Sequence, residues 1–75
     1  MDFSWALRKL KEGQAVRRES WDAYAHIPSE YAHVELVRDL PGFEPTPVVT
    51  RNDGSREPYR VNDQQLLAED WRLAD

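Results

Sequence analysis

The side chains best suited to chemistry lie between residues 17 and 24, where basic and aromatic residues are concentrated. Arg17 and Arg18 carry planar guanidinium groups that match the geometry of a phosphate. Trp21 follows them, and its flat indole can either stack on a purine base or fill part of a core. These residue types indicate a phosphate-bearing ligand, whereas Trp5 and Trp71 are expected in the core.

No residue pattern in the sequence indicates catalysis or a metal site. Glu69 and Asp70 are sequence neighbours, which does not suit a carboxylate pair held apart across a cleft. Asp70 is better suited to cap a backbone amide or to pair with Arg17 or Arg18. His26 and His33 do not follow a common metal-ligand spacing, and Pro28 stands between them. We therefore expect no enzyme, no metal and no cofactor.

Length and composition limit the chain to a single domain, residues 1–75. The absence of cysteine excludes disulfides, thiol catalysis and cysteine-based zinc sites, and fits a reducing compartment. No apolar run is long enough for a signal peptide or a membrane span. These features predict a cytoplasmic protein without a membrane partner.

Charge is distributed unevenly along a chain whose net charge is −4. Residues 1–18 hold five basic and two acidic side chains, a local charge of +3. Residues 19–75 hold five basic and twelve acidic side chains, a local charge of −7. This asymmetry fits an anion-binding end on an acidic body, or a solvated surface without a particular role. It argues against direct nucleic-acid binding.

Hydrophobic spacing predicts one helix near the N-terminus and short strands after it. Residues 3–12 carry an apolar stripe of helical period, and Gly13 stands where a helix commonly ends. Residues 14–19 alternate as a short strand, and a second short strand is expected over residues 23–27.

Residues 29–40 fit two patterns. Strand-like alternation is present at Ala32, Val34 and Leu36. Helical spacing is present at Tyr31, Val34, Val37 and Leu40. We favour a helix, because Ser29 suits an N-cap and Pro41 with Gly42 suits a stop. Residues 43–47 should then be an extended connection.

The rest of the chain predicts a hairpin. Asp53 and Gly54 lie between residues 48–51 and residues 57–61, which is a hairpin signal. Pro58 confines the second of these strands to an edge or a bulge.

A short helix and a final strand should follow. Asn62 and Gln65 have the spacing of a capping box, which would start a helix over residues 63–69 before a strand over residues 71–73. Core anchors are expected at Leu66, Leu67 and Trp71. The predicted fold class is α+β: an N-terminal helix packed on a small antiparallel sheet, with a short C-terminal helical turn and a final strand.

Two stretches of the sequence resemble a known family. Residues 3–21, FSWALRKLKEGQAVRRESW, are similar to its N-terminal pattern, and residues 52–71, NDGSREPYRVNDQQLLAEDW, are similar to its C-terminal pattern. The family is that of Thoeris anti-defence protein 2, which comprises small phage and prophage proteins. Two departures stand out: Gln65 occupies the place of the usual first Asp of a D-L-L-A motif, and residues 22–47 do not align with the family pattern.

The resemblance implies an oligomeric α+β protein, acting in the host cell cytoplasm, that traps a cyclic nucleotide immune signal without cleaving it. A signal of the glycocyclic ADP-ribose type is the expected ligand. The predicted ligand-binding residues are Arg18, Trp21, Tyr59 and Gln65. Trp21 would stack a base and Arg18 would bind phosphate, while Tyr59 and Gln65 would offer polar contacts. The alternative is an anti-CRISPR-type inhibitor that binds a bacterial defence effector protein through an acidic surface.

The small size of the chain predicts that it self-associates. A chain of this size buries only about 60% of its unfolded surface, so a monomer without disulfide or metal should be barely stable. The predicted interface for a homodimer or higher homo-oligomer comprises Tyr31, Val34, Val37 and Leu40.

Overall fold

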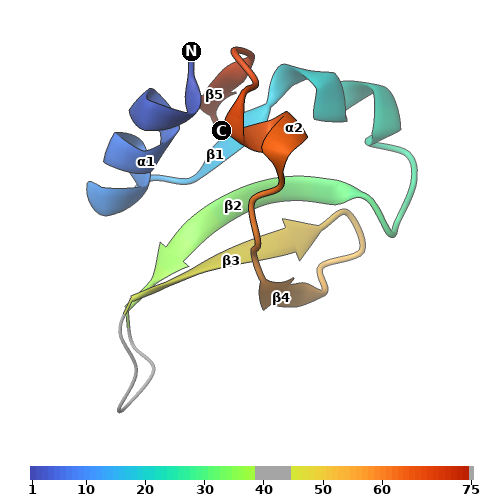
Figure 1. The fold of residues 1–75 in the computed structure, drawn as a ribbon. Helices are drawn as coiled ribbons and strands as arrows, with labels where there is room; N and C mark the ends of the chain where they lie inside the picture. The colour runs from blue at the N-terminus through green and yellow to red at the C-terminus, as the bar shows by residue number, and fades with distance from the viewer. Residues whose placement is uncertain (39–44, 75) are drawn as a thin grey trace.

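A single antiparallel sheet organises the chain, in a computed structural model that describes residues 1–38 and 45–74 (Figure 1). Within these residues the elements are α1 (Phe3–Lys11), β1 (Val16–Arg18), a 3-10 helix η1 (Glu19–Tyr24), β2 (Tyr31–Val37), β3 (Thr46–Arg51), β4 (Arg56–Pro58), α2 (Asp63–Leu66) and β5 (Trp71–Leu73). The five strands lie in the order β4-β3-β2-β1-β5. The predicted α+β class, with an N-terminal helix, a short C-terminal helix and a final strand, is confirmed.

Helix α1 begins and ends where its capping residues predict. The side chain of Asp2 accepts a hydrogen bond from the Trp5 amide at 2.9 Å, which satisfies one free donor of the first turn. Gly13 has a φ of +88°, a left-handed conformation that ends the helix at little cost. Ala6 and Leu10 are buried against the sheet. The helix packs on β5, β1 and β2.

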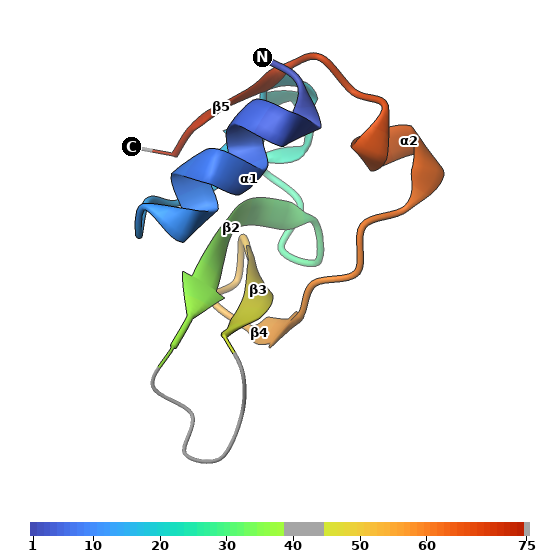
Figure 2. The same ribbon diagram turned by 60° about the vertical axis from the view of Figure 1, so that its left-hand side comes forward.

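The two ends of the chain are joined through β5. This strand pairs with β1, so that Arg18 lies opposite Trp71 and Arg17 lies opposite Arg72. The N-terminus lies beside β5, as two views show (Figures 1 and 2). The Met1 ammonium donates to the Glu69 carbonyl at 2.8 Å, and the Trp71 amide donates to the Met1 carbonyl at 3.0 Å.

The predicted helix over residues 29–40 is wrong, because Tyr31–Val37 form strand β2. Val34 lies opposite Val16 on one side and Val49 on the other, and all three side chains are fully buried. The register of β2 against β3 shifts between Tyr31 and His33. Pairing with two neighbouring strands thus decides between two patterns that local spacing left open. Leu40 lies outside the described residues.

The predicted strand over residues 23–27 is also wrong. Residues Glu19–Tyr24 form the 3-10 helix η1, and turns follow it. Strand β1 accordingly ends at Arg18, shorter than the predicted 14–19. The turn into η1 brings Trp21 into the core, where it is buried.

The predicted hairpin is confirmed, although its second strand β4 covers Arg56–Pro58 rather than residues 57–61. Of the predicted capping box only the Asn62 cap forms, because the Gln65 side-chain oxygen accepts from the Tyr59 hydroxyl instead. Gly54, with φ +88°, closes the turn between β3 and β4, and the Asp53 carboxylate accepts a hydrogen bond from the Ser55 amide at 2.9 Å. Pro58 lies on the edge strand β4. The Asn62 side chain accepts from the Gln65 amide at 2.8 Å and starts α2, which ends at Leu66 rather than residue 69. Of the extended connection predicted over 43–47, Thr46 and Pro47 belong to β3.

Aromatic side chains dominate the core. The buried apolar residues are Ala6, Leu10, Val16, Trp21, Val34, Val49, Tyr59 and Trp71. Trp71 meets the edges of two other rings, with centroids 5.5 Å from Phe3 and 5.6 Å from Trp21. Trp5 is partly buried against this cluster. Edge-to-face contacts of this kind stabilise a small core beyond the area they bury.

Among the described residues, the helices are too short and too polar to cross a membrane.

Candidate functional site

A cleft of about 440 Å³ lies between η1, the start of β2 and α2. Its lining comprises Arg18, Ser20, Trp21, Tyr24, Glu30, Tyr31, Gln64 and Gln65. A cation, an acid, two amides and three aromatic rings therefore face one space. The lining is more polar than apolar, and convergent polar groups beside aromatic rings can fix the orientation of a small ligand.

Arg18 reaches the cleft from the end of β1. Its Nε donates to a carboxylate oxygen of Asp70 at 2.7 Å, and the Arg18 side chain is only 16% exposed. Within the described part of the chain, Nε is the one Arg18 nitrogen that contacts Asp70. The two terminal amino groups of Arg18 therefore stay available to a ligand, and the guanidinium is held in place by its third nitrogen.

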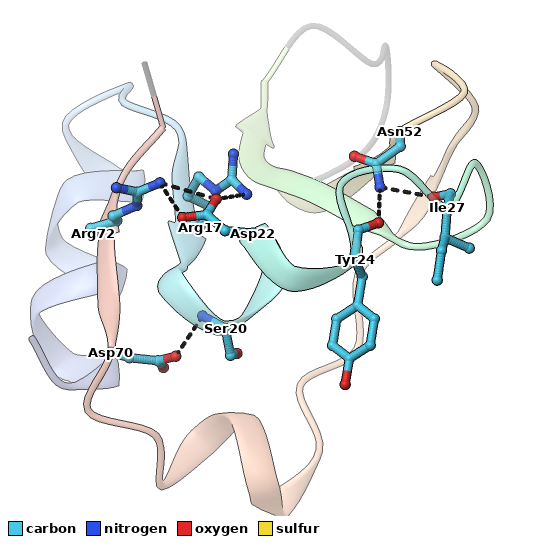
Figure 3. A network of polar contacts seen from close by, with 8 residues as sticks. All are labelled: Arg17, Ser20, Asp22, Tyr24, Ile27, Asn52, Asp70 and Arg72. Carbon is cyan, nitrogen blue, oxygen red and sulfur yellow. Dashed lines mark hydrogen bonds and ion pairs between the residues drawn. The ribbon is translucent and has the colours of Figure 1, made fainter.

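Asp70 holds two elements together at the base of the cleft. Its second carboxylate oxygen accepts from the Ser20 amide at 3.0 Å, which ties β5 to the first turn of η1 (Figure 3). Partial burial alone would raise the pKa of Asp70, but the hydrogen bonds from Arg18 and Ser20 outweigh it and hold the pKa below its ordinary value. Asp70 is thus both a cap and the partner of Arg18, as its position in the sequence suggested.

Arg17 points away from the cleft, since successive residues of a strand face opposite sides of the sheet. Its guanidinium bonds to Asp22 at 2.5 Å, and Arg72 bonds to the same carboxylate at 2.9 Å (Figure 3). Asp22 therefore bridges a cross-strand pair of arginines and offsets one of their two positive charges. Of the two arginines expected to suit phosphate, the fold directs Arg18 alone into the cleft.

The aromatic wall of the cleft has an inner and an outer part. Trp21 is buried and meets the Tyr31 ring edge-to-face at 5.6 Å, so only its margin borders the cleft. Tyr24 is 49% exposed and lines the cleft, so its ring is accessible to a ligand. Its backbone is held by Asn52, whose amide donates to the Tyr24 carbonyl at 3.0 Å and to the Ile27 carbonyl at 2.9 Å (Figure 3).

Tyr59 and Gln65 form the support beneath the cleft. The Tyr59 hydroxyl donates to the Gln65 side-chain oxygen, and the Trp71 indole donates to the Gln65 carbonyl at 3.1 Å. Burial raises the pKa of Tyr59 far above its ordinary value, so the phenol stays protonated and remains a donor. Gln65 borders the cleft, whereas Tyr59 lies below its lining.

A family model described as Tad2-like, the Thoeris anti-defense 2-like domain, matches residues 1–74. The chain belongs to the Tad2-like family. A comparison with curated proteins gives no significant match. The family membership gives this Tad2-like domain an anti-defence role, as the two sequence blocks implied.

The Tad2-like domain brings together three of the four predicted ligand-binding residues, Arg18, Trp21 and Gln65. Sequence reasoning did not assign the other lining residues to a ligand site: Ser20, Tyr24, Glu30, Tyr31 and Gln64. Tyr24 had a usable signal, because it belongs to the same run of basic and aromatic residues. The remaining four had none, since the turn that brings Glu30 and Tyr31 to the cleft is not evident from local spacing.

The predicted interface remains a prediction, except at Val34. Val34 is fully buried between β1 and β3 and has no surface to offer a partner. Tyr31 belongs to the aromatic cluster and the cleft, and Val37 is partly buried at the end of β2. The large exposed apolar residues lie elsewhere, and α2 with its C-cap carries two of them: Leu66 at 48% and Leu67 at 78% exposure. These two leucines were expected in the core.

Within residues 1–38 and 45–74, no three His, Asp or Glu side chains are grouped so that they could hold a metal ion.

Replacing Asp70 with asparagine is expected to lower the free energy of unfolding by about 1–2 kcal/mol near neutral pH, because a charged hydrogen-bond acceptor is lost. Since the folded pKa of Asp70 lies below its ordinary value, the wild type should have this advantage in full above pH 3.8 and lose it as the pH falls further. Urea unfolding of both proteins from pH 7 to pH 2.5 measures the difference. A gap that widens in acid would contradict the assigned role of Asp70.

Proposed function

We propose that this Tad2-like protein sequesters a cyclic nucleotide immune signal, of the glycocyclic ADP-ribose type, and does not cleave it. The observation that carries the proposal is the cleft in which a positioned guanidinium lies beside aromatic rings. Arg18 would bind a phosphate through its two free amino groups. A base would stack on the exposed ring of Tyr24 and against the margin of Trp21.

The lining of the cleft supports binding rather than bond cleavage. General acid-base catalysis needs a positioned acid or base with a suitable pKa, and cleavage commonly uses two such groups. The lining of this cleft offers one carboxylate, that of Glu30, and no histidine. A sponge needs only contacts that hold the ligand.

The strength of the contacts argues for a second copy of the chain at the cleft. Stacking of one base contributes about 1–3 kcal/mol, and a charge-assisted hydrogen bond about 1.5–3 kcal/mol. Nanomolar binding needs about 12 kcal/mol. One open cleft falls short of this, so we propose that a partner subunit encloses the ligand.

The apolar surface for this partner would be provided by Leu66 and Leu67, next to Gln64 in the cleft wall. Light scattering of the wild type at micromolar concentration should give twice the chain mass of 8.8 kDa or a higher multiple. Leu67→Glu should shift the mass toward 8.8 kDa, because it places a charge in the contact. Leu7→Glu, at an exposed position on α1, is the matched control and should leave the mass unchanged. A wild type of 8.8 kDa would contradict the shared pocket.

The sponge proposal is tested by recovery of the ligand. Mixed with a molar excess of protein, a cyclic ADP-ribose isomer should disappear from an ultrafiltrate, and denaturing the protein should return it with an unchanged mass. A ligand that stays in the filtrate, or that returns as a linear product, contradicts the proposal.

The alternative, inhibition of a defence effector protein through an acidic surface, finds less support in the charges of the fold. Four acidic residues of the region 19–75 are already paired with arginines: Asp22, Glu35, Glu57 and Asp70. Pairing lowers the negative potential that would imitate a phosphate backbone. Salt-sensitive capture of a basic effector in the absence of nucleotide binding would favour this alternative.

A further inference from the structure

Glu30 lies on the rim of the cleft in a turn that is fixed by hydrogen bonds on both sides. Its amide donates to the Ile27 carbonyl at 3.1 Å, and its carbonyl accepts from the Asn52 amide at 2.9 Å. The neighbouring Ser29 carbonyl accepts from the Arg51 guanidinium at 2.9 Å. The backbone of Glu30 is therefore held by the β3–β4 hairpin, which sets where its carboxylate can reach.

The charges around the cleft do not favour a highly anionic ligand. The positive charge of Arg18 is already offset by Asp70, its ion-pair partner. Among the ion pairs of the described residues, none includes Glu30. With one cation and two acids, the formal charge of this group is −1. Arg18 can bind a phosphate or pyrophosphate through its free amino groups, but a further phosphate placed near Glu30 would meet an unneutralised carboxylate.

A carboxylate accepts hydrogen bonds and donates none when it is ionised. In nucleotide sites, an acidic residue of this kind suits a ribose hydroxyl, whereas a ribose phosphate requires an arginine instead. Glu30 faces the same cleft as Arg18 but comes from a different element, so the two can contact different parts of one ligand. The arrangement thus suits a ligand with a phosphate at one end and a hydrogen-bond donor at the other.

We propose that Glu30 determines the specificity of the cleft: it accepts a hydrogen bond from a free ribose hydroxyl and rejects analogues that carry a phosphate there. This inference rests on the proposed nucleotide-binding function. It also explains why a site for an anionic ligand contains the carboxylate of Glu30. It predicts that the protein retains a ribose-bearing signal and ignores its phosphorylated counterpart.

The test compares cyclic ADP-ribose with cyclic ADP-ribose 2′-phosphate by calorimetry, for the wild type and for Glu30→Gln. The wild type should bind the unphosphorylated ligand at least about tenfold more tightly, because like charges disfavour the other. In Glu30→Gln the preference should fall toward unity, because the amide can donate to a phosphate. Glu12→Gln makes the same charge change at the far end of α1 and should keep the wild-type preference.

The outcomes separate the two levels of the proposal. Equal preference in the wild type and in Glu30→Gln, with binding intact and matching melting curves, overturns the role of Glu30 alone. A wild type that prefers the 2′-phosphate also overturns it. A wild type that binds neither ligand contradicts the proposed function, and the role of Glu30 falls with it.

Discussion

Replacing Trp71 with alanine is expected to lower the free energy of unfolding by about 3–5 kcal/mol. The side chain is 1% exposed, its ring meets Phe3 and Trp21, and its indole nitrogen donates to the Gln65 carbonyl. The substitution would leave a large cavity and remove the indole hydrogen bond to the Gln65 carbonyl, which would keep only its backbone donors. Because a small domain has only about 5 kcal/mol or less to lose, most of the protein should unfold at room temperature.

Chemical denaturation followed by tryptophan fluorescence measures this loss. Glu69→Ala is the matched control from the same stretch of chain, because its side chain is exposed and the change should stay within about 0.5 kcal/mol. Similar losses for the two variants would mean that the aromatic cluster does not form the core.

Replacing Arg18 with methionine is expected to weaken nucleotide binding about 100-fold. The substitution removes the phosphate contact, which corresponds to about 1.5–3 kcal/mol, and it leaves the Asp70 carboxylate unpaired beside the ligand. Arg18→Lys should have an intermediate effect, because it keeps the charge but loses the planar fork. Calorimetry of each variant with cyclic ADP-ribose gives the affinities.

Arg17→Met is the control for this prediction. Arg17 is the preceding residue and also pairs with an aspartate, yet it lies on the opposite face of β1. Its replacement removes the same charge and a similar ion pair without touching the cleft. Equal losses of affinity at the two positions would indicate a general charge effect and contradict the assigned phosphate contact.

Local sequence signals were sufficient to predict an element where capping or turn residues at its ends fix its bounds. Helix α1 has a cap at Asp2 and a stop at Gly13, and the hairpin has its turn at Asp53 and Gly54. The N-cap at Asn62 also forms as predicted. In each case the hydrogen bonds that fix the element lie within a few residues of one another, so that neighbouring residue types reveal them.

The errors arose where distant pairing decides the structure. Residues 31–37 have apolar spacing compatible with a helix, but Val34 completes a row with Val16 and Val49 across three strands. The residue buried by α2 is Gln65 rather than a leucine, because Tyr59 and Trp71 both bond to it. No local pattern contains these contacts.

Only part of the candidate site was predictable, because only some of its residues are close in sequence. Arg18 and Trp21 are close in sequence, and their residue types alone indicated a phosphate-bearing ligand. Glu30 and Gln64 join them only because β2 and α2 fold back toward η1. The polar residues on this side of the cleft are therefore brought to it by the tertiary structure.

Calorimetric titration of the wild type shows directly whether this Tad2-like protein binds a cyclic nucleotide in the Arg18 cleft. The ligands are cyclic ADP-ribose isomers and cyclic dinucleotides. We expect saturable binding of at least one cyclic ADP-ribose isomer, with Arg17→Met binding as tightly and Arg18→Met far more weakly. Absence of binding to every ligand, by a protein shown to be folded, would contradict the claim.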